Sequence, residues 1–206
     1  MIRTTRRTAL QLTLMWLATP GAMAQQKPHA TDWRTRLVDA ARRQIGVTTI
    51  YDPAYTRIAY PGGDVAPERG VCTDVVIRAY RSAFGLDLQK LVHEDMVANF
   101  AAYPKAWGLK APDSNIDHRR VPNLAVFFGR RGGAVPVGQD PADYRAGDLV
   151  TQMLPGNLPH IAIVSSNRSD QASDRPLVIH NIGQGAREED TLFAFRQTGH
   201  FRFAPA

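Results

Sequence analysis

The chain has 206 residues, of which 44% are apolar and 21% charged, a composition typical of a globular domain large enough to bury a core. Its 25 basic and 19 acidic residues give a formal net charge of +6. This mild excess suits an anionic surface. However, the sequence has no basic stripe with interleaved aromatic residues, so we do not expect a nucleic-acid partner.

Residues 1–24 have the pattern of a cleaved signal peptide. Three arginines precede an apolar run at 9–17, and Ala-Met-Ala at 22–24 supplies the small residues that signal peptidase requires. Arginine pairs are common in charged signal starts, so we expect general secretion rather than twin-arginine export. Cleavage would remove three arginines and no acidic residue, which lowers the formal charge to +3 and leaves one domain, residues 25–206. No segment approaches the roughly 18 apolar residues of a membrane span, so we expect an exported, periplasmic or secreted protein without stable membrane insertion.

The first half of the remaining chain is predicted to be helical. Apolar residues at helical spacing, with capping residues before them or glycine after them, indicate helices over 32–45, 72–84 and 87–103. The long connection 47–71 is rich in Tyr, Pro and Gly, and connections of this length in compact domains usually bind or catalyse. Residues 103–122 are predicted to be a loop, followed by a short helical or extended run, NLAVFF.

The second half is predicted to be a sheet. Five short segments are rich in strand-forming residues and are separated by turn residues: DLVTQML, HIAIVSS, PLVIHNI, TLFAF and GHFRF. Because the helices come first and the strands second, we expect an α+β domain in which helices pack on an antiparallel sheet.

Cys72 is the single cysteine of the chain, so in an oxidising compartment it can form no bridge within its own fold. Its predicted place in the first turn of a helix offers unpaired N–H groups and the positive end of the helix dipole, which lower the pKa of a thiol and can bind an oxyanion. A buried structural cysteine needs neither, although most lone cysteines are inert small hydrophobic residues. Asp74 is interpreted as a stabiliser of the helix end.

Two histidines could serve such a nucleophile. His160 begins the segment HIAIV and His180 ends PLVIH, and the polar linker between them predicts a hairpin centred near Asp170. In a symmetric hairpin the two histidines lie opposite each other on one face, about 5 Å apart at Cβ. One imidazole can then accept the thiol proton while the other orients its ring. Asn181 would face the opposite side, unless a one-residue bulge exchanges it with His180.

These motifs resemble a known group of enzymes. GVCTDVV, then AGDLV with its aspartate twelve residues before His160, then VIH, are similar in order and spacing to the NlpC-type branch of papain-like cysteine peptidases. That resemblance implies a papain-like fold and cleavage of amide bonds in cell-wall peptides. The chain departs from the pattern in having Val71 instead of aspartate before the cysteine, and Thr73-Asp74 instead of Ser-Gly after it. These differences leave the triad intact but put the substrate in doubt.

A closer resemblance covers nearly all of residues 32–204. The stretches YDPAYTRIAYPGGDVAPERGVCTDVVIRAYR, NIDHRRVPNL and HNIGQG are similar to the bacterial exported family called domain of unknown function 1287. That family carries no established activity.

Four further residues are candidates for binding substrate. The NlpC-type resemblance implies a tyrosine upstream of the nucleophile that lines the oxyanion site, and both Tyr51 and Tyr60 fit this role. Tyrosines in such loops usually anchor the loop by packing instead. In the segment DHRR, Arg119 or Arg120 could bind a substrate carboxylate, and a solvated charged loop is the alternative.

We therefore expect an α+β, papain-like cysteine peptidase or amidase that acts on peptidoglycan stem peptides without a cofactor. Cys72 is the expected nucleophile, His160 the base and His180 the orienting residue. Three alternatives stay open: a zinc site made by the same three residues, a non-catalytic envelope-binding module, and a lipid acyltransferase on the same fold. The scissile bond and the oligomeric state do not follow from the sequence.

Overall fold

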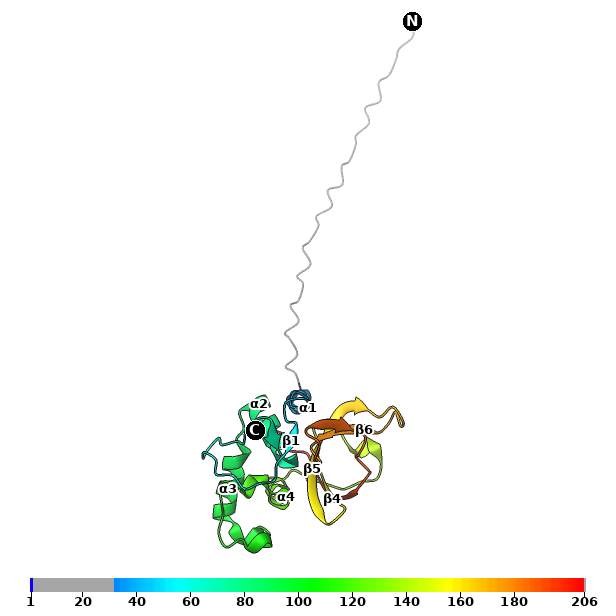
Figure 1. Cartoon of the computed structure of the whole chain (residues 1–206). Coiled ribbons are helices and arrows are strands. Elements are labelled where there is room, and N and C mark those ends of the chain that lie inside the picture. Colours follow the sequence, from blue (N-terminus) through cyan, green and yellow to red (C-terminus); the bar gives the residue numbers. More distant parts are fainter. Residues whose placement is uncertain (2–31, 206) are drawn as a thin grey trace. The chain divides into compact units, whose positions relative to one another are not determined.

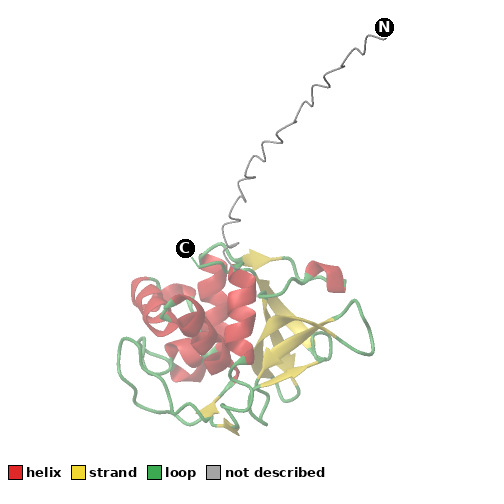
Figure 2. Ribbon diagram, turned by 90° about the horizontal axis from the view of Figure 1, so that it is seen from above, coloured by secondary structure: helices red, strands yellow, loops and turns green. Residues whose placement is uncertain are grey.

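The computed structural model describes Met1 and residues 32–205. Apart from Met1, the predicted signal peptide lies outside these residues. Residues 32–205 belong to one compact unit, an α+β domain in which the helices lie on one side of a six-stranded antiparallel sheet (Figures 1 and 2). None of the helices in this part of the chain combines the length and apolar character needed to cross a bilayer.

The helices follow the predicted order. The four α-helices are α1 (Trp33–Arg42), α2 (Cys72–Phe84), α3 (Leu88–Ala98) and α4 (Val121–Arg130). Short 3-10 turns lie at Phe100–Ala102, Ala106–Gly108, Asp117–Arg119 and Pro141–Asp143. The segment NLAVFF is therefore helical. Helix α1 is shorter than expected, because the chain turns after Arg42 and passes through Gly46 at φ 80°.

Helix α2 is central to the domain, and its ends have clear local causes. Its N-terminus is closed by the Asp74 carboxylate, which accepts the Val71 N–H at 2.7 Å. Its C-terminus is closed by Gly85, which adopts the left-handed conformation at φ 68°. Between these ends an apolar face is fully buried against α1 and the sheet, and includes Val75, Val76, Ala79 and Tyr80.

The main sheet has the strand order β3-β8-β4-β5-β6-β7. Its strands are β3 (Ala134–Val135), β4 (Leu149–Leu154), β5 (Leu158–Arg168), β6 (Pro176–His180), β7 (Arg187–Glu189) and β8 (Arg196–Phe201). A separate parallel pair joins β1 (Ile50–Tyr51) to β2 (Arg69–Gly70) and so brings the two ends of the long connection together.

One predicted strand is wrong. The segment TLFAF, residues 191–195, forms turns, and the strand in this region is β7, which comes earlier. Leu192 is nevertheless buried, and the Gln152 side chain donates to the carbonyl oxygens of Thr191 and Leu192 at 3.0 and 2.9 Å. A side chain therefore satisfies backbone groups that a strand would have paired with a neighbouring strand.

The sheet is buried on both faces by two groups of apolar residues. Ile161, Ile163 and Ile179 pack with the helices in the larger group. Residues that alternate with them, including Ala162 and Val178, belong to a second group with Tyr144 and Leu192. Because β5 and β6 contribute to both groups, their sequences read as nearly continuous apolar runs.

The predicted register of the hairpin is wrong by two residues. Strands β5 and β6 pair Ile163 with Ile179, so His180 falls opposite position 162 rather than opposite His160. The cause is the position of the turn: Arg168 pairs with Pro176, so the hairpin is centred at position 172 and not at Asp170, and the irregularity between Val164 and Arg168 corrects only part of this displacement. A shift of two residues keeps both histidines on one face, because side chains alternate with a period of two.

Candidate active site

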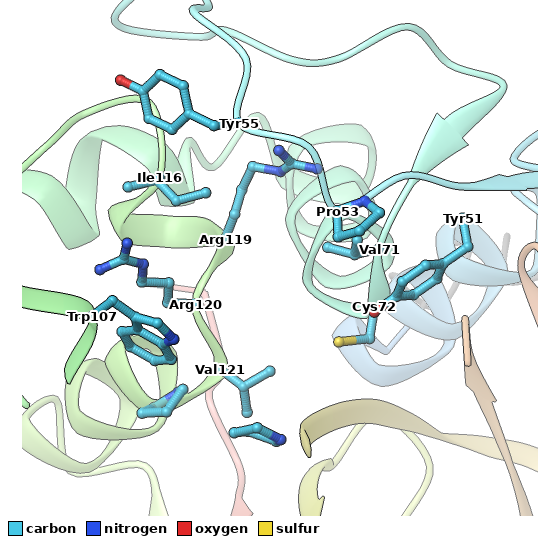
Figure 3. Close-up of a pocket in the computed structure, with 12 residues that line it drawn as sticks. Tyr51, Pro53, Tyr55, Val71, Cys72, Trp107, Ile116, Arg119, Arg120 and Val121 are labelled. Atoms are coloured by element: carbon cyan, nitrogen blue, oxygen red, sulfur yellow. The ribbon is translucent and has the colours of Figure 1, made fainter. Parts of the chain in front are cut away.

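Cys72 is the first residue of α2 and lines a pocket of about 340 Å³. Its side chain is 5% exposed, and Figure 3 shows the sulfur directed into the pocket. The walls come from the long connection, from residues 107–122 and from the start of β5: Tyr51, Pro53, Tyr55, Val71, Trp107, Ile116, Arg119, Arg120, Val121, Pro122 and Pro159. The thiol is therefore held by a rigid helix but stays open to a ligand.

Burial raises the pKa of the Cys72 thiol to about 11. Hydrogen bonding to the backbone of Ile161, of Thr73 and of Cys72 itself lowers the pKa, but by less than burial raises it, and Asp74 raises it further. The helix start therefore lowers this pKa as expected, but burial outweighs it and the net shift is upward. A neutral thiol needs a base that removes its proton as it attacks.

The two histidines are joined by a hydrogen bond. His160 Nε2 and His180 Nδ1 are 2.9 Å apart, and the ring centroids are 5.0 Å apart. The other nitrogen of His180, Nε2, lies 3.0 Å from Glu189 Oε2. Both rings are buried, whereas the Glu189 side chain is 38% exposed. Diagonal neighbours on adjacent strands are thus close enough for their rings to meet, despite the shifted register.

The direction of these hydrogen bonds fixes the tautomers of both rings. A carboxylate only accepts, so His180 Nε2 carries a proton and donates to Glu189. When neutral, His180 then accepts at Nδ1, and His160 donates from Nε2. The lone pair of His160 is left on Nδ1, as a general base requires.

Both rings are neutral at physiological pH. Burial, together with the neighbouring His180, lowers the pKa of His160 to about 3. Burial also lowers the pKa of His180, although the hydrogen bond to Glu189 acts in the opposite direction. Neither ring is protonated before a reaction begins, so the lone pair of His160 is free.

The part of β5 that lies near the thiol is Pro159 and the backbone of Ile161, the two neighbours of His160, and among the described residues His160 itself does not line the pocket. The backbone of Ile161 is close enough to the Cys72 sulfur to lower the pKa of the thiol. No hydrogen bond joins the thiol to either imidazole among residues 32–205. Contacts between a nucleophile and its base are often long without substrate and tighten when substrate binds.

The structure separates the two candidate tyrosines. Tyr51 lines the pocket beside Cys72 (Figure 3), and burial together with the nearby thiol raises the pKa of its hydroxyl. Tyr60 lies away from the pocket and packs edge-on against His93, with ring centroids 5.1 Å apart. The structure therefore brings Tyr51 to the thiol and leaves Tyr60 in a packing position.

Arg119 is engaged by an ion pair. Its Nε and Nη2 each lie 3.0 Å from one oxygen of Asp74, and both side chains are 3% exposed. Arg119 also donates to the carbonyl oxygens of Asp52 and Ala54. Its guanidinium therefore links residues 52–54 to the start of α2. Because Arg119 is already paired, Arg120 is the arginine of this segment that can bind a substrate carboxylate.

Asn181 has no part in the histidine row. Its side chain donates to the carbonyl oxygen of Gly70 at 3.1 Å and accepts the N–H of Gly183 at 3.0 Å. Asn181 thus holds the backbone just before Cys72, while His180 makes the contact to His160.

Comparison with known proteins places the chain in a family. A model described as "Domain of unknown function (DUF1287)" matches residues 38–203. The chain belongs to this family. An uncharacterised Escherichia coli K12 protein, YijF, is 58% identical to it over 167 residues, which are 81% of this chain and 80% of that protein. Neither description names an activity, so the function of this DUF1287 protein has to be argued from its site.

Glu189 is the member of the site that sequence reasoning missed. It lies in the segment GQGAREED, where no strand was expected. The sequence does place an acidic residue a few positions after PLVIH. A strand that follows β6 and pairs with it in the antiparallel direction brings such a residue next to His180. Strand β7 does so by pairing Arg187 with His180.

Two further histidines pair with carboxylates away from the pocket. His93 Nδ1 lies 2.8 Å from Asp117 Oδ2, and His200 Nε2 lies 2.8 Å from Asp148 Oδ2. Asp148, the aspartate of AGDLV, also binds Arg202 and is fully buried. These contacts join distant segments and are part of the fold's internal support.

The zinc alternative finds no support in the geometry. Within residues 32–205, no group of three His, Cys, Asp or Glu side chains is gathered as a set of metal ligands. The facing nitrogens of His160 and His180 are used by each other, and Glu189 takes the remaining one of His180.

Proposed function

We propose that this DUF1287 protein is a cysteine-dependent amide hydrolase with a papain-like arrangement, acting on peptidoglycan stem peptides in the cell envelope. One observation carries the proposal. A cysteine at a helix start opens into a pocket that is also lined by Pro159, the residue before His160, and His160 forms a hydrogen-bonded row with His180 and Glu189 whose tautomers leave a lone pair on His160.

The acylation step uses His160 as the base. His160 Nδ1 takes the proton from the Cys72 thiol while the sulfur attacks the carbonyl carbon of the substrate amide. The developing oxyanion is bound by the N–H of Cys72, one of the unpaired donors of the first helical turn, and by the Tyr51 hydroxyl. The protonated His160 then gives its proton to the leaving amine, and the carbon–nitrogen bond breaks to leave a thioester.

The deacylation step restores the enzyme. His160 takes a proton from water, the hydroxide attacks the thioester carbonyl, and the sulfur leaves and regains its proton from His160. In both steps His180 accepts the hydrogen bond from His160 Nε2, and this bond strengthens when His160 becomes a cation. Glu189 keeps His180 in the accepting tautomer.

The cell envelope is proposed from the sequence together with the pocket. The predicted signal peptide directs the chain out of the cytoplasm, and the mild positive charge suits an anionic cell wall. The pocket is open and lined by prolines and aromatic rings, which suits an extended peptide in a groove.

The proposal is tested with purified muropeptides. We expect the wild-type protein to release products whose masses add up to the substrate plus one water, and Cys72→Ala to release none. Arg196→Gln is a matched control, because Arg196 is exposed and lies outside the pocket. Full activity of Cys72→Ala would refute the proposal. Binding without cleavage by the wild type would favour the envelope-binding module.

A further inference from the structure

The pocket has two chemically different sides. Cys72 and Tyr51 lie on one side, and Trp107 and Arg120 lie on the opposite side, as Figure 3 shows. The proposed chemistry uses only the first side. The second side therefore has no assigned role, although it is formed by an exposed aromatic ring and a guanidinium.

Of the two arginines in the pocket wall, only Arg119 is neutralised. Asp74 compensates the charge of Arg119 through the bidentate ion pair. Within residues 32–205 the side chain of Arg120 makes no ion pair and no hydrogen bond, and its Nη1 is buried without a partner. A buried donor without an acceptor is unfavourable, so this nitrogen favours a ligand that brings one.

The surroundings of Arg120 hold its guanidinium in place without forming a hydrogen bond to it. The group lies over the Trp107 ring at 4.5 Å. The nearby Asp113 carboxylate attracts the Arg120 charge but makes no hydrogen bond to it, and its oxygens accept from the Tyr55 hydroxyl at 2.9 Å and from the Asn115 side chain at 2.8 Å. A stacked guanidinium keeps its N–H edge available.

The chemistry of this side selects an anion with an apolar stem. A guanidinium binds a carboxylate through two parallel hydrogen bonds, both strengthened by the opposite charges. A carboxamide is neutral and offers only one acceptor oxygen, so it binds more weakly. Val121 lies between Arg120 and the thiol in Figure 3, and the apolar residues Ile116 and Pro122 also line the pocket. Methylene groups can lie against this wall, so the side fits a short aliphatic chain that ends in a carboxylate.

We propose that Arg120, stacked on Trp107, is a carboxylate subsite that makes the protein selective for substrates with a free carboxylate on the residue next to the reacting carbonyl. This rests on the proposed function, because Cys72 must react in the same pocket. Peptides in which that carboxylate is converted to a carboxamide are poor substrates.

The test uses two peptide amides with an N-terminal bromoacetyl group, which differ only in a Glu or a Gln at the next position. Both alkylate Cys72 with loss of bromide, so the rate of labelling reports binding without any hydrolysis. We expect the Glu peptide to label the wild-type protein about tenfold faster or more, as removing one charge-assisted contact predicts. In Arg120→Gln the two rates become equal, in Arg120→Lys a reduced preference remains, and Arg196→Gln keeps the wild-type preference.

Two controls keep the result interpretable. Iodoacetamide should label Arg120→Gln as fast as the wild type, which shows that the variant is folded and its thiol unchanged. In the wild type the Glu preference should fall as salt is added, because salt screens the attraction. Equal rates for the two peptides in the wild type, or a preference that survives in Arg120→Gln, would overturn the subsite.

The outcome is separable from that of the proposed function. Muropeptide cleavage with equal labelling rates would leave the hydrolase standing and remove the subsite. A Glu preference that depends on Arg120, without cleavage of any muropeptide, would confirm the subsite and count against the hydrolase.

Discussion

Replacing Glu189 with leucine should inactivate His160, although the two side chains share no contact. Glu189 fixes the row of tautomers by accepting from His180 Nε2 at 3.0 Å. Leucine removes this acceptor, so His180 can move its proton to Nδ1 and donate to His160. The proton of His160 then lies on Nδ1, on the nitrogen that should receive the thiol proton.

The loss of kcat/KM in Glu189→Leu depends on whether the substitution only removes a hydrogen bond or also changes the tautomer of His160. Loss of one hydrogen bond to a charged group is worth about 1.5–3 kcal/mol, and the 38% exposure of Glu189 favours the lower end. That alone lowers kcat/KM by about tenfold. A wrong tautomer of the catalytic histidine lowers kcat by up to about 10⁴-fold. We therefore expect Glu189→Leu to lose more than tenfold, and Glu189→Gln to lose less, because the amide oxygen can still accept from His180.

The assay combines muropeptide kinetics with nitrogen NMR of the histidine rings. The kinetics measure kcat/KM, and the NMR distinguishes protonated from unprotonated ring nitrogens. Glu94→Leu is the control, since Glu94 is an exposed glutamate on α3 outside the pocket. The reasoning is refuted if Glu189→Leu keeps wild-type kcat/KM, or if it loses activity while His160 Nδ1 stays unprotonated.

Three further predictions concern reactivity and stability. Because the pKa of Cys72 is raised to about 11, its thiolate fraction grows as pH rises, so iodoacetamide labelling should accelerate steadily from pH 7 to 10; a plateau near pH 6 would contradict this. Arg119→Met should lower the free energy of unfolding by about 3–5 kcal/mol in urea, since it leaves the Asp74 charge buried and unpaired, and adding Asp74→Asn should recover part of the loss. Gly185→Ala should cost about 2–4 kcal/mol in the same measurement, because the new Cβ would lie 2.7 Å from the carbonyl oxygen of Thr48 at φ +83°; an unchanged urea midpoint would show that this backbone can relax.

Local sequence patterns were sufficient for the elements that carry the site. The helix that begins at Cys72 and ends before Gly85 is confirmed, since apolar spacing and a glycine stop act within a few residues of each other. The segregation of helices and strands into an α+β domain is confirmed for the same reason. The two histidines share a face because the register differs from the prediction by two residues, and an even shift leaves every side chain on its face. This explains why the contact at 2.9 Å survives a wrong register.

The strand register, the contact of Glu189 with His180, the pairing of Arg119 and the pKa of the thiol were decided by the tertiary structure. Each depends on groups that are far apart in the sequence. The position of the turn and the pairing irregularity together set the register, and strand β7, which no pattern predicted, brought Glu189 to His180. The ion pair with Asp74 fixed Arg119 and left Arg120 as the unpaired guanidinium in the pocket. The thiol pKa was decided in the same way. The helix start is a local feature that lowers it, but burial by packed neighbours from other segments raises it by more, because desolvation acts on the charged form wherever those neighbours come from.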